Sequence, residues 1–148
     1  MSNKQLKLKI VTPEKLVLEE LVESVTLPTM EGEITILPEH VPIIAGLKSG
    51  DIVAIANGEH IPMAVVGGFV EVKKEDGITT VAVLADFAEH IADITDEAIE
   101  KAKARAEELQ KIANNKEIVD FEHFATELER SLTRVKIADK WKTRKYRR

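Results

Sequence analysis

The chain has 148 residues, with 21 basic and 26 acidic side chains and a net charge of −5. Its acidity disfavours non-specific nucleic-acid binding, which depends on neutralising phosphates. The absence of cysteine excludes disulfide frameworks, thiolate zinc sites and thiol nucleophiles. No apolar run reaches the roughly 20 residues that span a bilayer. The N-terminus alternates polar and apolar residues, unlike a signal peptide, so we expect a soluble protein of the cytoplasm.

Glycine and proline divide the chain into two parts. All seven glycines lie between Gly32 and Gly77, and all five prolines lie between Pro13 and Pro62. Residues 78–148 contain neither type. Because Gly and Pro mark turns and interrupt helices, the two parts are expected to form different kinds of structure.

The first part has short apolar runs with period-two alternation, which is typical of a β-sandwich or barrel. The pairs Asn57-Gly58 and Asp76-Gly77 predict hairpin turns. The pair Gly67-Gly68 indicates a bulge or a close approach of two backbones. The expected strands are residues 6–10, 15–18, 22–27, 33–37, 51–56, 60–65, 69–72 and 79–84.

The second part has apolar residues at helical spacing. Thr95 is a good N-cap before a first helix that ends near Asn114, and Asp120 is expected to cap a second helix. The expected stripe of the first helix is Ala98, Ala102, Ala106, Leu109 and Ala113. That of the second is Phe121, Phe124, Ala125, Leu128, Leu132, Val135 and Ala138. We therefore predict an α+β protein, with an antiparallel β-sandwich in residues 1–88 and an antiparallel α-helical hairpin in residues 89–148.

No residue pattern points to catalysis. The sequence has no H-E-x-x-H, no G-x-S-x-G and no phosphate-binding loop. The histidines are scattered without metal-ligand spacing: His40, His60, His90 and His123. The residues therefore favour a binding or mechanical module without a metal, not an enzyme.

One loop between two prolines stands out. Pro38 and Pro42 enclose His40 in a stretch that follows the expected strand 33–37. Proline fixes its own φ and restricts the residue before it, so this loop is expected to be stiff. It is either a rigid turn with an incidental histidine or a docking edge.

Several stretches in order resemble one family. They are LKIVTPEKLVLEELVESVTLPTMEGEITILPEHVPIIAGLKSG, VVGGFVEV and TTVAVLADFAEHI, followed by the alanine- and charge-rich hairpin. The chain resembles the epsilon subunit of bacterial F-type ATP synthases, called delta in mitochondria. The resemblance implies a non-catalytic rotor subunit that couples proton flow to ATP synthesis. It also implies a peripheral location on the cytoplasmic face of the cell membrane, within the complex.

The resemblance also implies partners. The sandwich of such subunits contacts the gamma subunit and the ring of c subunits, and Glu33 and His40 match the loop that faces them. An acidic sandwich would meet basic ring loops with complementary charge. The alternative for Glu33 is a solvated carboxylate in a turn.

In bacterial members the hairpin regulates the enzyme. It either folds down or extends along gamma into the catalytic alpha/beta hexamer, where it blocks hydrolysis. An alanine face removes little apolar area from water, so its docking is expected to be weak. As one continuous helix, residues 95–140 would reach roughly 70 Å.

Some relatives bind ATP between the folded helices, which suggests an alternative role as a nucleotide-sensing module. Thr95 and Ala98 stand where that family motif has Asp and Arg. The arginines that match could instead pair with surface glutamates. The candidate ATP-binding residues are Glu89, Ile94, Arg105, Arg130 and Arg134.

The C-terminus is strongly basic. Residues 136–148 contain seven basic residues and one acidic residue. Basic residues with Trp141 and Tyr146 between them suit stacking on bases or a membrane surface. The remaining alternatives are a frayed terminus and, in line with the resemblance, a segment that binds acidic loops of the catalytic beta subunits.

Overall fold

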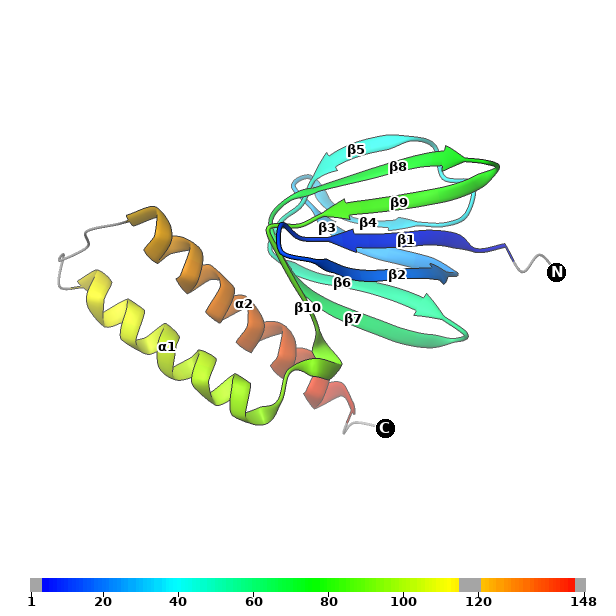
Figure 1. Cartoon of the computed structure of the whole chain (residues 1–148). Coiled ribbons are helices and arrows are strands. Elements are labelled where there is room, and N and C mark those ends of the chain that lie inside the picture. Colours follow the sequence, from blue (N-terminus) through cyan, green and yellow to red (C-terminus); the bar gives the residue numbers. More distant parts are fainter. Residues whose placement is uncertain (1–3, 115–120, 146–148) are drawn as a thin grey trace. The chain divides into compact units, whose positions relative to one another are not determined.

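The computed structural model describes residues 4–114 and 121–145. The chain divides into two compact units, Met1–His90 and Ile91–Arg148 (Figure 1). We describe each unit by itself.

The first unit is a sandwich of two five-stranded sheets (Figure 1). The first sheet has the order β2-β1-β9-β8-β5, and the second has the order β10-β7-β6-β3-β4. The predicted β-sandwich is confirmed, and every neighbouring pair is antiparallel except β1 and β9, which pair in parallel. The strands are β1 (Leu6–Val11), β2 (Leu16–Val22), β3 (Ser24–Thr29), β4 (Gly32–Ile36), β5 (Ile43–Gly46), β6 (Gly50–Ala56), β7 (Glu59–Val66), β8 (Phe69–Glu75), β9 (Ile78–Leu84) and β10 (Phe87–His90).

The alternation along the strands produces the core. In β1 the side chains of Leu6, Leu8 and Ile10 are fully buried while the lysines between them are exposed. The inward residues of both sheets form one apolar cluster that includes Val25, Ile52, Met63, Val70, Val81 and Val83. The sandwich is therefore held by burial of the apolar half of each strand.

Two strands lie where the sequence predicted none. β5 begins directly after the predicted proline loop, and β10 extends the second sheet beyond the predicted last strand. Both have four residues and lie at sheet edges, so each pairs with one neighbour only. Short edge strands carry too little alternation to be recognised locally, because their pairing depends on a partner distant in sequence.

The glycine pair connects the two sheets. Gly67 and Gly68 lie between β7, in the second sheet, and β8, in the first, so they do not form a bulge within one strand. Gly68 has φ +106°, and a Cβ there would overlap the carbonyl oxygen of Leu84 and lie 2.8 Å from Ala85 Cα. The predicted close approach of two backbones is confirmed.

Replacing Gly68 by alanine is expected to lower the free energy of unfolding by at least about 3 kcal/mol, because the added methyl collides with backbone atoms that cannot move independently. Gly58→Ala is the matched control, since Gly58 also has positive φ (+77°) but a Cβ added there would meet nothing within 4 Å. That control is expected to cost only about 1–2 kcal/mol. Urea denaturation of the full chain measures both, and equal losses would contradict the close contact.

The second unit contains the two predicted helices. After a short 3₁₀ turn, η1 (Ile91–Asp93), come α1 (Asp96–Asn114) and α2 (Phe121–Lys145). Thr95 Oγ1 accepts a hydrogen bond of 3.0 Å from the amide of Ala98, which confirms the predicted N-cap. The predicted cap Asp120 lies outside the described residues. α2 ends later than predicted, and residues 140–145 are helical instead of frayed, because strong helix formers continue to its end.

Ala102, Ala106 and Leu109 of the predicted α1 stripe are buried, whereas Ala98 is half-buried. The face of α2 differs more, because it buries Ser131, Thr133, Ile137 and Ala138, of which only Ala138 was predicted, while the predicted Leu132 is 43% exposed. Glu127 pairs with α1 and precedes Ser131 by four residues, so Glu127, Ser131 and Ala138 share the face turned to α1. Small residues on this face suit the alanine face of α1, because they allow two helices to pack closely. The buried residues of α1 are Ile99, Ala102, Ala106 and Leu109.

Candidate functional site

An apolar band crosses the outer face of the first sheet. Strand pairing places Phe69 of β8 beside Leu84 of β9, Leu84 beside Val11 of β1, and Val11 beside Leu16 of β2. Phe69 is 62% exposed, Leu84 60% and Leu16 50%, while Val11 is half-buried. Ile44, on the edge strand β5, is 74% exposed and pairs with Glu71 of β8, two residues after Phe69. We call Val11, Leu16, Ile44, Phe69 and Leu84 the apolar band.

The direction of these side chains follows from the alternation of the strands. Val70 and Val83, the neighbours of Phe69 and Leu84 along the chain, are fully buried in the core. Successive side chains of a strand point to opposite faces, so the band residues point away from the core. A contiguous exposed apolar surface of this kind marks an interaction site more often than a solvated surface.

Beyond the band, the same face carries ion pairs. Lys7 Nζ lies 2.9 Å from Glu19, and Lys73 Nζ lies 3.4 Å from Glu71 and 2.7 Å from Glu75. Hydrogen bonding to Lys7 lowers the pKa of Glu19, and hydrogen bonding to Lys73 lowers the pKa of Glu75. An apolar centre beside a polar, charged margin is the usual anatomy of a protein–protein interface.

A second exposed feature is the turn Leu37–His40, which we call the docking turn. The amide of His40 donates a 3.1 Å hydrogen bond to the carbonyl oxygen of Leu37, which closes the turn. Pro38 is its second residue, and Glu39, its third, has φ +73°. This is the arrangement of a type II turn, in which glycine is the favoured third residue.

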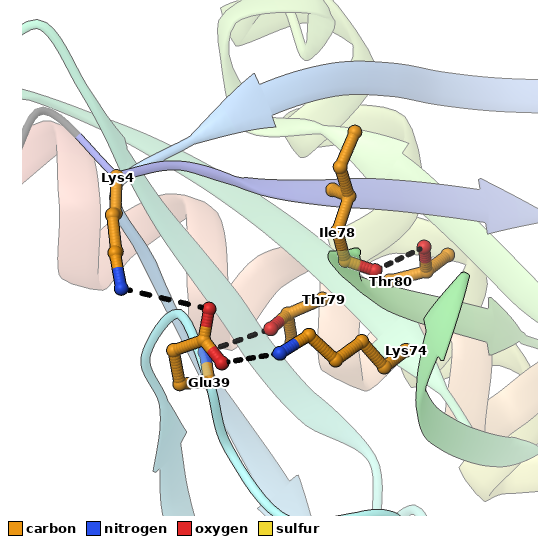
Figure 2. A network of polar contacts seen from close by, with 6 residues as sticks. All are labelled: Lys4, Glu39, Lys74, Ile78, Thr79 and Thr80. Carbon is orange, nitrogen blue, oxygen red and sulfur yellow. Dashed lines mark hydrogen bonds and ion pairs between the residues drawn. The ribbon is translucent and has the colours of Figure 1, made fainter. Parts of the chain in front are cut away.

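Three contacts attach Glu39 to the rest of the sandwich (Figure 2). Its amide donates a 2.7 Å hydrogen bond to Thr79 Oγ1 on β9. Its carboxylate accepts a 2.6 Å hydrogen bond from Lys74 Nζ on β8, and Lys4 Nζ lies 3.7 Å from the other oxygen. Hydrogen bonding and charge from Lys74, assisted by Lys4, lower the pKa of the Glu39 carboxyl.

Apolar side chains lie at both ends of the docking turn, with Leu37 as its first residue and Val41 directly after it. Leu37 is 56% exposed and Val41 is 67% exposed. His40 between them is half-buried, and its Nδ1 donates a 2.6 Å hydrogen bond to the carbonyl oxygen of Val41. The backbone therefore holds the imidazole in one orientation while the two apolar side chains face solvent.

The structure does not bring the two predicted contact residues together. Glu33 is exposed at the start of β4, opposite Pro28 of β3, whereas His40 follows the other end of β4. Residues 33–36 alone span about 10 Å of strand. The two residues therefore do not share one loop, which corrects the sequence interpretation.

Charged contacts link the helices of the second unit. Arg105 of α1 donates to both oxygens of Glu127 on α2, at 2.6 and 3.1 Å, and also contacts Glu108 at 3.1 Å. Lys142, near the end of α2, lies 2.8 Å from Asp96 at the start of α1. Hydrogen bonds from Arg105 and Lys142 lower the pKa values of Glu127 and Asp96 from 4.5 and 3.8. These ion pairs therefore stabilise the hairpin fully at a pH above the ordinary pKa values of the two carboxyls. The stabilisation is lost as the pH falls through the lowered pKa values, because the carboxylates then become protonated.

The candidate ATP-binding residues occupy varied environments. Ile94 is 2% exposed, so its side chain is not open to a ligand in this structure. Arg105 already binds two carboxylates, so a phosphate would have to replace them. Glu89 lies on β10, and Arg130 and Arg134 lie on α2, all three half-buried. ATP binding stays a prediction.

In the described part of the chain, no group of three acidic or histidine side chains is arranged to hold a metal.

α2 also carries an open apolar hollow of about 430 Å³. It is lined by Phe124, Ala125, Leu128, Glu129, Leu132 and Thr133. Several of these residues belong to the predicted stripe, but Leu132 remains exposed in the hairpin. Of the lining residues, Glu129 is exposed as well, Thr133 is buried, and the rest are half-buried.

Comparison with known proteins identifies the family. Residues 5–91 match the family described as "ATP synthase, Delta/Epsilon chain, beta-sandwich domain". The chain belongs to the delta/epsilon family of ATP synthase subunits. It is 42% identical over 134 residues to the ATP synthase epsilon chain of Nitratidesulfovibrio vulgaris, covering 90% of this chain and 96% of that one. It is 38% identical over 133 residues to the epsilon chain of Desulforamulus reducens, with 90% and 96% covered.

Solved structures share the fold. A chain in the mitochondrial ATP synthase of Euglena gracilis aligns with a TM-score of 0.62 and 19% identity, covering 98% of this chain and 85% of that chain. A chain in the central stalk and c-ring structure of the Tetrahymena thermophila enzyme aligns with a TM-score of 0.55 and 16% identity, covering 94% and 98%. Among the described residues, neither helix is long and apolar enough to cross a membrane.

Sequence reasoning missed the apolar band and the anchoring of Glu39. The outward apolar residues of β8 and β9 were visible as breaks in the alternation, because Phe69 and Leu84 stand where polar residues are expected. The contact between Glu39 and Thr79 joins residues 40 positions apart, and no local signal predicts it.

Proposed function

We propose that the chain is a non-catalytic central-stalk subunit of the F-type ATP synthase that binds the gamma subunit and the c-subunit ring. The apolar band carries this proposal, because it is an exposed apolar surface with a charged margin on a family member whose relatives are ATP synthase epsilon chains. In this role the subunit couples proton flow through the ring to ATP synthesis. It is a peripheral subunit on the cytoplasmic face of the cell membrane, held there by the complex.

The sandwich offers two further contacts at separate places. Glu33, beside the turn between β3 and β4, presents a carboxylate that suits basic loops of the ring. The docking turn with His40, Leu37 and Val41 presents a mainly apolar surface that suits gamma. Since Glu33 lies at the start of β4 and His40 lies beyond its other end, they would serve different contacts.

The hairpin is proposed to inhibit ATP hydrolysis by extending toward the catalytic alpha/beta hexamer. Its helices bury several small residues beside Ile99, Leu109 and Ile137, and the ion pairs between them are partly exposed, so water screens them. Opening therefore costs little, and a partner surface can compensate for it. The hollow and exposed Leu132 on α2 provide an apolar surface for that partner.

Replacing both Glu33 and His40 by alanine is expected to lower proton-driven ATP synthesis by a factor of about two to five, because polar contacts contribute roughly 0.5–1.5 kcal/mol each. Hydrolysis by the soluble catalytic part should stay unchanged, since neither residue belongs to a catalytic site. Synthesis in membrane vesicles and hydrolysis in solution measure the two effects.

The matched control replaces Glu59 and His60 by alanine, which removes the same residue types from exposed positions on β7. It should leave both activities unchanged. If the Glu33/His40 variant also synthesises ATP at the normal rate, these two residues are not contacts. If the unmodified chain does not co-purify with gamma and the ring, the proposed function is wrong.

A further inference from the structure

The docking turn contains a residue of unfavourable type. The third residue of a type II turn has positive φ, and glycine meets that requirement without steric cost. This chain has Glu39 there, with φ +73°. A left-handed conformation in a residue with a Cβ persists only where the surrounding structure determines it.

The surroundings of Glu39 hold it in this left-handed conformation. Both its backbone and its side chain are attached to the first sheet, through Thr79 on β9 and Lys74 on β8, and Lys4 approaches the carboxylate as well (Figure 2). Thr79 is only 3% exposed, so its hydroxyl is itself held by packing. A glycine at this position would keep the amide contact but would lack the carboxylate.

We propose that Glu39 is a positioning residue, whose carboxylate fastens the docking turn to β8 and thereby keeps exposed Leu37 and Val41 in a fixed place for the gamma contact. The inference rests on the proposed rotor function and names the residue that organises one of its contacts. A turn that is already ordered loses less conformational freedom on binding, and the complex dissociates more slowly as a result.

The contrast with the adjacent lysine supports this assignment. Lys73 and Lys74 are neighbours on β8, and their side chains point to opposite faces. Lys73 pairs with Glu71 and Glu75 of its own strand, so it joins nothing distant in sequence. Lys74 pairs with Glu39, 35 residues away, and so ties a loop to the sheet.

The test uses the full chain with Glu39→Gly, which favours the turn conformation and removes the carboxylate. In the isolated subunit, amide hydrogen exchange of residues 37–42 should become about tenfold faster, with an unchanged melting temperature. From the assembled complex of gamma and c-ring, the variant should dissociate about three- to tenfold faster. High salt should accelerate release of the unmodified chain more than release of the variant, because salt screens the charges of the interface in both but the Glu39–Lys74 ion pair only in the unmodified chain.

Two lysine variants supply the matched control. Lys74→Met should resemble Glu39→Gly in exchange and in release, and Lys73→Met, a change in the charged margin of the apolar band, should leave the exchange of residues 37–42 as it is in the unmodified chain. Glu39→Gln, whose amide oxygen can still accept a hydrogen bond from Lys74, should recover part of the slow release. A general loss of structure would alter the melting temperature and would not distinguish the two lysines.

The outcomes separate the two proposals. If the unmodified chain binds the complex but Glu39→Gly and Lys74→Met are released at its rate, the positioning role is wrong and the rotor function stands. Equal effects of Lys73→Met and Lys74→Met on the exchange of residues 37–42 would also overturn the positioning role. If the unmodified chain does not join the complex, the rotor function is wrong, and this inference with it.

Discussion

Removing residues 91–148 is expected to raise ATP hydrolysis by the assembled complex by roughly tenfold, if opening of the hairpin costs only a few kcal/mol. The helices bury three large aliphatic side chains, Ile99, Leu109 and Ile137, among small residues that remove little apolar area from water, so the apolar contact that closes the hairpin is limited. Neither helix contains Gly or Pro, so both persist as helices after opening. The measurement compares steady-state hydrolysis by complexes with the full and the shortened chain.

A shorter truncation isolates the basic tail. Removing residues 136–148 would also delete buried Ile137 and Ala138 and the Lys142 partner of Asp96, so it would disturb the hairpin itself. Removing residues 143–148 deletes four basic residues and keeps that ion pair. This variant is expected to relieve inhibition by about two- to threefold, as raised salt should do for the intact complex. Equal hydrolysis in all forms would mean that another subunit or bound ADP sets the rate.

Replacing Leu84 by aspartate is expected to weaken binding to gamma by at least about 100-fold, which corresponds to roughly 3 kcal/mol. Leu84 lies in the middle of the apolar band, between Phe69 and Val11, where a partner would exclude water most completely. An unpaired carboxylate in that position would have to be desolvated on binding. Titration of the full chain against a gamma–c-ring complex measures the affinity.

Leu21→Asp is the matched control, because it makes the same change on the same sheet outside the band. Leu21 is 53% exposed and lies opposite Lys7, among the ion pairs of that face. Both variants should keep the melting temperature of the isolated chain, since Leu84 and Leu21 contribute little to the core. If both bind gamma with unchanged affinity, the apolar band is not the contact surface.

The sequence by itself determined the organisation of the protein into a β-rich and a helical part. Period-two alternation, the turns at Asn57-Gly58 and Asp76-Gly77, and the N-cap at Thr95 all act between residues a few positions apart. The same local reasoning placed eight of the strands approximately and the start of α1 correctly. The assignment of Glu33 and His40 as partner contacts came from family resemblance, because the local sequence distinguished only the stretch around His40, through its two prolines.

Only the tertiary structure decided which residues form a surface. The apolar band joins Val11 and Leu16 to Phe69 and Leu84 through strand register, and register depends on pairing between segments more than 50 residues apart. Glu39 likewise acquires its role from Thr79 and Lys74, which other strands supply. On α2, the choice of Ser131 over Leu132 for the buried face depended on the shape of α1. A local pattern determines to which face of a strand a side chain points, but only packing brings distant side chains together.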